Sequence, residues 1–161
     1  MKVLEVLCRP VSTCTEDTTL AAAARLMEEN DCGVLPVVRA SRLVGVVTDR
    51  DVCVAVGRKR NPQEVPVRDV MTKDVAVCGV GDDVRQALAV MANRRVRRLP
   101  AVDARGNLEG IVSIDDVVIR AEEPDPSRER PAISCRDVVT TLRAICGSRR
   151  VRPVASLSAV P

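Results

Sequence analysis

The sequence has no histidine and no aromatic residue among its 161 positions. Without histidine there is no Ser-His-Asp or Cys-His catalytic machinery, no imidazole metal ligand and no side chain with an unperturbed pKa near 6.5. Without Phe, Trp or Tyr there is no ring on which a nucleic-acid base can stack. The hydrophobic core must therefore be aliphatic throughout.

Long apolar runs and a strong charge imbalance are also missing. No stretch of about 18 uncharged apolar residues occurs, which argues against a transmembrane helix. The N-terminus lacks the apolar segment of a secretory signal. The 25 basic and 22 acidic residues leave a net charge of +3, which is too small to favour a nucleic-acid partner. We therefore expect a cytoplasmic protein with no membrane partner, folded as one domain or as two small ones sharing a core.

The chain has seven cysteines, an odd number, and no CxxC pair. This usage is typical of small apolar residues in a reducing compartment, and we expect Cys14 and Cys78 to be buried. A zinc site made only of cysteines would need four thiolates from distant segments. A redox-sensing role would need an exposed thiol with a lowered pKa, for which Cys135 and Cys146 are the candidates.

Two copies of one unit follow each other along the chain. Val3–Cys14 aligns with Val67–Cys78, 64 positions later (67 − 3). After one extra residue near Gly106, Gly45–Asp51 aligns with Gly110–Asp116, 65 positions later (110 − 45). A register kept over this length indicates an internal duplication. Each copy has about 60 residues and would be marginally stable alone, so we expect the two to pack together.

Each copy shows the pattern strand, helix, strand, strand, helix. Apolar residues at i, i+3, i+4 and i+7 predict a helix over Leu20–Met27 and another over Val84–Met91. The N-caps predicted for these helices are Thr18 or Thr19 and Asp82 or Asp83. The strands predicted from β-rich runs are Val11–Cys14, Val34–Val38, Leu43–Val47, Arg98–Val102 and Leu108–Val112. Second helices are expected to start near Asp51 and near Asp116.

The C-terminal part of the chain differs from both copies. Pro124–Pro131 has the composition of a linker. Ser134 and Asp137 have the spacing of a capping box, which predicts a short amphipathic helix that ends at Gly147. Ser148–Pro161 is expected to be poorly ordered. The predicted boundaries are 1–62 for the first unit, 63–123 for the second, and 124–161 for linker, helix and basic tail.

The candidate site is a hydroxyl and a carboxylate three residues apart, where a strand ends and a helix begins. The pairs are Thr48 with Asp51 in the first copy and Ser113 with Asp116 in the second. One interpretation is a capping box, which stabilises the helix start by about 1 kcal/mol. The other adds a ligand, because a carboxylate at such a position can accept hydrogen bonds from two ribose hydroxyls. The residues alone leave both interpretations open.

The doubled unit resembles a tandem pair of CBS (cystathionine-β-synthase) domains over residues 1–123. The motifs that carry the resemblance are VLPVV with GVVTDRD in the first copy and RLPAV with GIVSIDD in the second. The resemblance implies an α+β fold of two β-α-β-β-α units packed sheet to sheet with pseudo-two-fold symmetry. Stand-alone bacterial members can end in a similar extra helix, here Val138–Cys146.

The same resemblance implies a regulatory, non-enzymatic protein, often a homodimer, that binds adenine nucleotides such as AMP, ADP or ATP in clefts between the units. No cofactor is required. A protein with no attached enzyme would signal through a partner, and the C-terminal helix is the expected contact. The alternative is a structural or stress-response homodimer with empty clefts, or with a metal or another small molecule in them. No nucleophile–base pair supports an enzyme.

Carried over by motif, the site residues fall into two unequal clefts. In the first, Ser113 and Asp116 would hold the ribose and Ile111 the base. The opposite wall would be formed by Ser12, Cys32 and Gly33, and Arg97 would reach phosphate. The second cleft would use Thr48, Asp51 and Val46, facing Ala76, Val96 and Arg97. Its phosphate position is Gly33, for which Arg50 or Arg58 could substitute, so we expect the Asp116 cleft to bind more strongly.

Overall fold

The computed structural model describes residues 1–123 and 132–147. The first copy contains the 3-10 helix η1 (Val3–Glu5), α1 (Leu20–Glu29), β1 (Val34–Arg39), β2 (Arg42–Thr48) and α2 (Asp49–Gly57). The second contains η2 (Val67–Asp69), β3 (Cys78–Gly79), α3 (Val84–Arg94), β4 (Arg98–Val102), β5 (Leu108–Ser113) and α4 (Ile114–Val118). The C-terminal helix α5 spans Cys135–Cys146. The predicted linker and tail, Pro124–Pro131 and Ser148–Pro161, lie outside the described residues.

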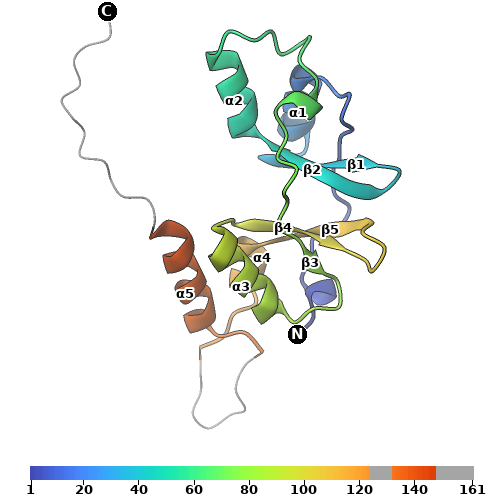
Figure 1. The fold of residues 1–161 in the computed structure, drawn as a ribbon. Coiled ribbons are helices and arrows are strands. Elements are labelled where there is room, and N and C mark those ends of the chain that lie inside the picture. The colour runs from blue at the N-terminus through green and yellow to red at the C-terminus, as the bar shows by residue number, and fades with distance from the viewer. Residues whose placement is uncertain (124–131, 148–161) are drawn as a thin grey trace, which may run out of the picture.

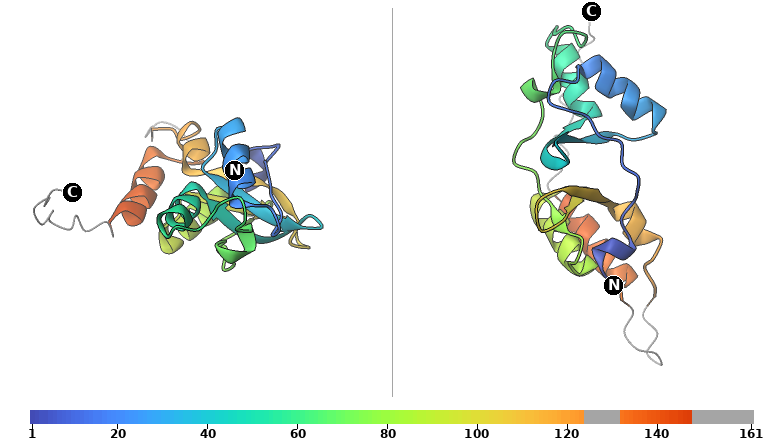
Figure 2. Two further views of the ribbon diagram at one scale, coloured as in Figure 1. Left: turned by 90° about the horizontal axis from the view of Figure 1, so that it is seen from above. Right: turned by 90° about the vertical axis from the view of Figure 1, so that its right-hand side faces the viewer.

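Two small sheets lie face to face at the centre, with helices on their outer sides (Figures 1 and 2). Strands β1 and β2 pair antiparallel, while β3 runs parallel to β4 and β4 antiparallel to β5. The two hairpin turns also meet, because Leu43 N donates to Gly106 O at 3.2 Å and Leu108 N to Ser41 O at 2.9 Å. The α+β fold with sheet-to-sheet packing is therefore confirmed.

The predicted Val11–Cys14 strand is largely wrong. Only Cys14 pairs with a strand, through a parallel bridge to Val37, whereas the equivalent Cys78–Gly79 forms β3. Val11 and Ser12 instead line a cavity between the two copies. This part of the chain crosses from one unit to the other, so little of it runs beside β1.

The buried apolar side chains form two clusters, which corrects the expectation of one shared core. Along β2 and β5, alternate residues point to opposite sides of each sheet. Val47 and Val112 are fully buried within the clusters on the helical sides. Val46 and Ile111, on the other sides, are only half-buried. The facing sides of the sheets therefore leave room between the units.

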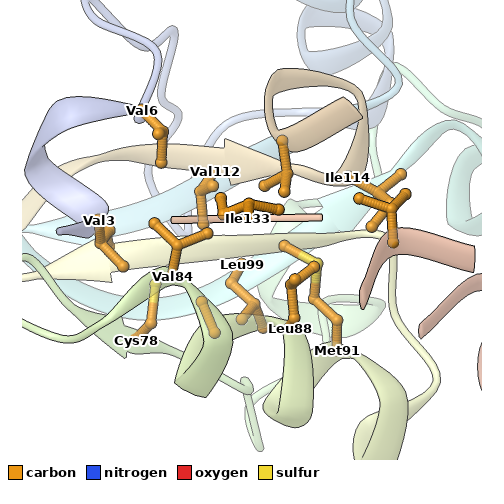
Figure 3. Close-up of a cluster of buried hydrophobic side chains, with 14 residues drawn as sticks. Val3, Val6, Cys78, Val84, Leu88, Met91, Leu99, Val112, Ile114 and Ile133 are labelled. Carbon is orange, nitrogen blue, oxygen red and sulfur yellow. The ribbon is translucent and has the colours of Figure 1, made fainter. Parts of the chain in front are cut away.

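The segment before the first helix of each copy packs in the core of the other copy. Val3 and Val6 lie in one cluster with Leu99 and Val112 of the second copy (Figure 3). Conversely, Val67 and Met71 belong to the cluster of the first copy. Backbone hydrogen bonds hold both crossings: Val3 N donates to Asp82 O at 2.9 Å, and Val67 N to Thr18 O at 2.8 Å. The two units are thus interlocked by their leading segments.

The glycine at the start of each repeated motif permits this crossing. A Cβ on Gly110 would meet the Leu7 side chain and come within 2.9 Å of Cys8 O. A Cβ on Gly45 would lie 3.0 Å from Thr72 O. Real Cβ atoms rarely approach backbone oxygens so closely. Both positions therefore need glycine, because the segment that precedes the first helix of the other copy passes over the strand there.

Helix α5 covers the second unit. It contacts α3 and α4 (Figure 1), and Ile133 and Val138 lie in the cluster of that unit. The predicted capping box is confirmed, since the Ser134 hydroxyl accepts from Asp137 N at 3.2 Å and Ser134 N donates to Asp137 Oδ2 at 3.0 Å. Among residues 1–123 and 132–147, none of the helices combines the length and apolar character that crossing a bilayer requires.

Candidate functional site

Both repeated hydroxyl–carboxylate pairs are capping boxes with nearly the same geometry. Ser113 N donates to Asp116 Oδ2 at 2.8 Å and the Ser113 hydroxyl donates to the same oxygen at 2.7 Å. In the first copy, Thr48 makes the same two bonds to Asp51 Oδ2, at 2.9 and 2.7 Å. Oδ1 takes no part in either box. The two interpretations of the motif are thus compatible, because one carboxylate oxygen caps the helix and the other remains for a ligand.

A cavity of about 270 Å³ lies between the two copies at the second of these boxes. The segment before α1, the α1–β1 connection and the strands β4 and β5 all contribute to its wall. Its lining residues are Cys8, Pro10, Val11, Ser12, Asn30, Asp31, Cys32, Val34, Arg98, Ile111, Ser113 and Asp116. The cavity combines an apolar part, from valine and isoleucine side chains, with a few polar groups. This mixture is typical of small-molecule sites.

The cavity brings together most residues that the resemblance assigned to the Asp116 cleft. Its lining includes Ser113, Asp116, Ile111, Ser12 and Cys32. Gly33 and Arg97 do not line it. A Cβ on Gly33 would instead face the Asp49 carboxylate at 3.0 Å, and the carbonyl oxygen of Arg97 accepts from Ile114 N at 2.9 Å.

Several lining residues were missed at the sequence level. Arg98, rather than Arg97, is the cation in the wall. Its position could have been found from the hairpin register, because Arg98 pairs with Ser113 across β4 and β5. The position of Cys8 could not have been found in this way. Cys8 lies beside Ile111 only because the segment before α1 crosses to the second copy, where Cys8 N donates to Ile111 O at 2.8 Å.

Asp51 lines a different cavity, of about 250 Å³, between α2 and η2. The suggested phosphate substitutes Arg50 and Arg58 line this cavity as well, together with Arg60 and Asp69, which form an ion pair at 2.9 Å. Of the residues assigned to the second cleft, Val46, Thr48, Ala76, Val96 and Arg97 line neither of the two cavities. The structure thus brings most residues assigned to the Asp116 cleft into one cavity, whereas the residues assigned to the Asp51 cleft do not share one.

An ion pair distinguishes the second cleft from the first. Arg94 and Asp74 bond at 2.7 Å, and they occupy the positions that Asn30 and Pro10 hold in the first copy, 64 residues earlier (94 − 30; 74 − 10). Asn30 and Pro10 line the open cavity. The two copies therefore differ in residue type and in pairing at these positions, and the unequal affinity of the two clefts stays a prediction.

The cysteines fall into classes of different reactivity. Burial raises the pKa of Cys14 to about 11, and burial with a smaller contribution from Asp82 raises the pKa of Cys78 to about 11. A hydrogen bond with Glu123 is the main cause that raises the pKa of Cys135. Cys135 therefore lacks the lowered pKa that redox sensing requires, which corrects that candidate. Cys146 is exposed, as expected.

Across the described ranges 1–123 and 132–147, no group of three or more Cys, Asp or Glu side chains is placed to hold a metal ion.

Both copies match the CBS domain family, over residues 3–58 and 67–123. Among characterised relatives, the inosine-5'-monophosphate dehydrogenase of Thermoplasma acidophilum is 34% identical over 124 residues, which are 77% of this chain and 24% of the enzyme. The chain thus spans about a quarter of the length of that relative.

Two solved structures of similar fold each cover about three quarters of this chain. The crystal structure of hypoxic response protein I with two coordinated zinc ions is 27% identical, with a TM-score of 0.70 over 76% of this chain and 100% of the other. A CBS domain protein from Pyrobaculum aerophilum complexed with AMP is 25% identical, with a TM-score of 0.67 over 72% of this chain and 89% of the other.

Proposed function

Since the chain belongs to the CBS domain family, we propose that it is a regulatory binding module that senses adenine nucleotides in the Asp116 cleft. The observation that carries the proposal is the cavity between the copies, lined by Ser113, Asp116 and Ile111. The AMP complex of the Pyrobaculum relative supports the choice of ligand class. The absence of histidine from the sequence favours binding over general acid–base catalysis.

Each part of a nucleotide has a matching group in this cleft. Oδ1 of Asp116 is outside the capping box and can accept the ribose hydroxyls. Ile111, Val11 and Val34 offer aliphatic surface to the base. Arg98 lines the cavity and, with the adjacent Arg97, supplies positive charge for phosphate.

Aliphatic contacts and the absence of an imidazole set the expected character of binding. Adenine would be held without ring stacking, which otherwise contributes about 1–3 kcal/mol per base. We therefore propose modest affinity and little pH dependence near neutrality. A sensor needs affinity near the working concentration of its ligand, so modest binding suits this role.

A thermal-shift screen of the full chain tests the ligand class directly. AMP, ADP, ATP, S-adenosylmethionine and zinc chloride would be added separately to the reduced protein. We expect AMP, ADP or ATP to raise the melting temperature, with stabilisation that follows RT ln(1 + [L]/Kd). A shift with zinc alone, or with none of the five, would reject adenine-nucleotide sensing and favour the structural alternative.

We further propose that the protein acts as a cytoplasmic homodimer. Exposed aliphatic side chains on the outer helices support this, notably Val54 and Val56 of α2 and Ile119 after α4, which is 80% exposed. Sedimentation equilibrium is expected to give twice the monomer mass, and Val56→Asp is expected to weaken the association, with Glu64→Asp as an exposed control. A monomer at all concentrations would contradict the dimer. These exposed residues, or the exposed face of α5, would then be candidate contacts with a different protein partner.

A further inference from the structure

Two of the seven cysteines line the cavity of the Asp116 cleft. Cys8 is exposed and Cys32 is half-buried, and both are free thiols. In the second copy, the equivalent positions 64 residues later are Thr72 and Val96. Within the described residues, cysteines therefore line the Asp116 cavity, which gathers most of the assigned site residues, and not the Asp51 cavity.

The backbone holds Cys8 directly against the proposed base site. Cys8 N donates to Ile111 O at 2.8 Å, and Ile111 N donates to Cys8 O at 3.4 Å. Cys32 is held in the α1–β1 connection opposite, where Cys32 N donates to Met27 O at 2.9 Å. Both cysteines line the same cavity as Ile111 and Asp116, so a bulky group on either sulfur would compete with a ligand for that space.

The remaining cysteines provide contrast within the same molecule. Cys14 and Cys78 are buried, and their pKa values of about 11 leave almost no thiolate at neutral pH. Cys53 is exposed on α2 and lines neither cavity. It is therefore an internal control for a thiol that reacts independently of the cleft.

We propose that Cys8 and Cys32 form a thiol-modification site, at which a low-molecular-weight disulfide reacts and thereby excludes the nucleotide. This inference rests on the proposed function, because it names a second regulator of the same cleft. Adenine-nucleotide binding would then respond both to the nucleotide concentration and to the thiol–disulfide balance around the protein.

The reaction is thiol–disulfide exchange and needs no further reactant. The cysteine thiolate attacks one sulfur of the small disulfide and forms a new S–S bond with that half. The original S–S bond breaks, and the other half leaves as a thiolate, which takes up the proton lost by the cysteine. The cysteine is oxidised and the small disulfide is reduced, so electrons and atoms balance.

The size of the cavity makes the two occupants mutually exclusive. Its volume of about 270 Å³ is close to the lower end of the range of about 300–1,000 Å³ for small-molecule sites, so it offers room for one ligand. A peptide-sized adduct on Cys8 or Cys32 and a nucleotide cannot both fit. Conversely, a bound nucleotide would shield both sulfurs from attack.

The test uses the full chain and oxidised glutathione as the disulfide. Peptide mapping by mass spectrometry locates the adducts, and titration calorimetry measures AMP binding before and after reaction. The control variant carries Cys8→Thr and Cys32→Val, the residues present in the other copy. We expect the modified wild-type protein to bind AMP at least tenfold more weakly than the untreated protein. For the variant, we expect the AMP affinity before and after treatment to be the same.

Protection gives an independent measurement. At ten times its Kd, AMP should slow the labelling of Cys8 and Cys32 roughly tenfold, because only the unoccupied fraction reacts, and should leave Cys53 unchanged. Unaltered AMP binding after modification, or adducts only on Cys53 and Cys146, would overturn this inference and leave the proposed function intact. Failure of the reduced wild-type protein to bind AMP, ADP or ATP would overturn the proposed function, and this inference with it.

Discussion

Replacing Asp116 by alanine is expected to weaken AMP binding by roughly 10- to 150-fold, as measured by titration calorimetry. Hydrogen bonds to a charged acceptor contribute about 1.5–3 kcal/mol, and Asp116 lines the assembled cavity with one carboxylate oxygen outside the capping box. Asp51→Ala is the matched control, because Asp51 lies in an equivalent capping box but lines a separate cavity, which Val46, Ala76 and Val96 do not line. We expect Asp51→Ala to change the AMP affinity by less than about threefold, since the contact it removes lies outside the assembled cleft.

The comparison separates the loss of a ligand contact from the loss of a helix cap. Both variants lose a capping box of nearly the same geometry, so both should lose about 1 kcal/mol of unfolding free energy. Denaturant titration of the two variants measures that cost. Equal loss of AMP affinity in both variants, or none in either, would show that Asp116 serves only as a cap.

Replacing Val3 and Val6 together by alanine is expected to lower the unfolding free energy by about 4 kcal/mol in urea denaturation. Each substitution removes two methyl groups from a fully buried side chain, which costs about 2 kcal/mol including the cavity left behind. Because these valines pack with Leu99 and Val112, hydrogen exchange should show that β4 and β5 lose protection before β1 and β2.

The exposed neighbour Leu4 supplies the control. Leu4 lies in the same 3-10 helix but is 54% exposed, so Leu4→Ala should change the stability by less than about 0.5 kcal/mol. Preferential loss of protection in β1 and β2 would show that Val3 and Val6 pack within the predicted first unit, residues 1–62. It would contradict their packing in the core of the second copy.

The local elements of this protein are largely predictable. Strand β4 spans Arg98–Val102 as expected, and β5 extends one residue beyond its expected end. The capping boxes at Ser113 and Ser134 also form as expected. These features depend on alternation, helical spacing and side chains within three or four residues, so the short-range pattern contains the information that they need.

The lining of the candidate site was only partly predictable. Ser113, Asp116 and Ile111 follow from a local motif that forms its own capping box. Arg98 lies outside that motif, but the register of the β4–β5 hairpin could have placed it opposite Ser113. Cys8 enters the wall only because the segment before α1 crosses to the second copy. No local pattern specifies which residue a distant segment will lie against.

The sequence by itself determined that the core is aliphatic and that one unit is duplicated. It also determined that a hydroxyl–carboxylate pair with the spacing of a helix capping box follows the last strand of each copy. Only the tertiary structure decided that the segment before the first helix of each copy packs in the other copy. It also decided that Asp116 lines a cavity together with most of the residues assigned to its cleft. The exchange joins residues far apart in the chain, as where Arg9 Nε donates to Glu109 O at 2.7 Å across 100 positions. Composition and periodicity act over a few residues, whereas such contacts depend on how two complete units pack.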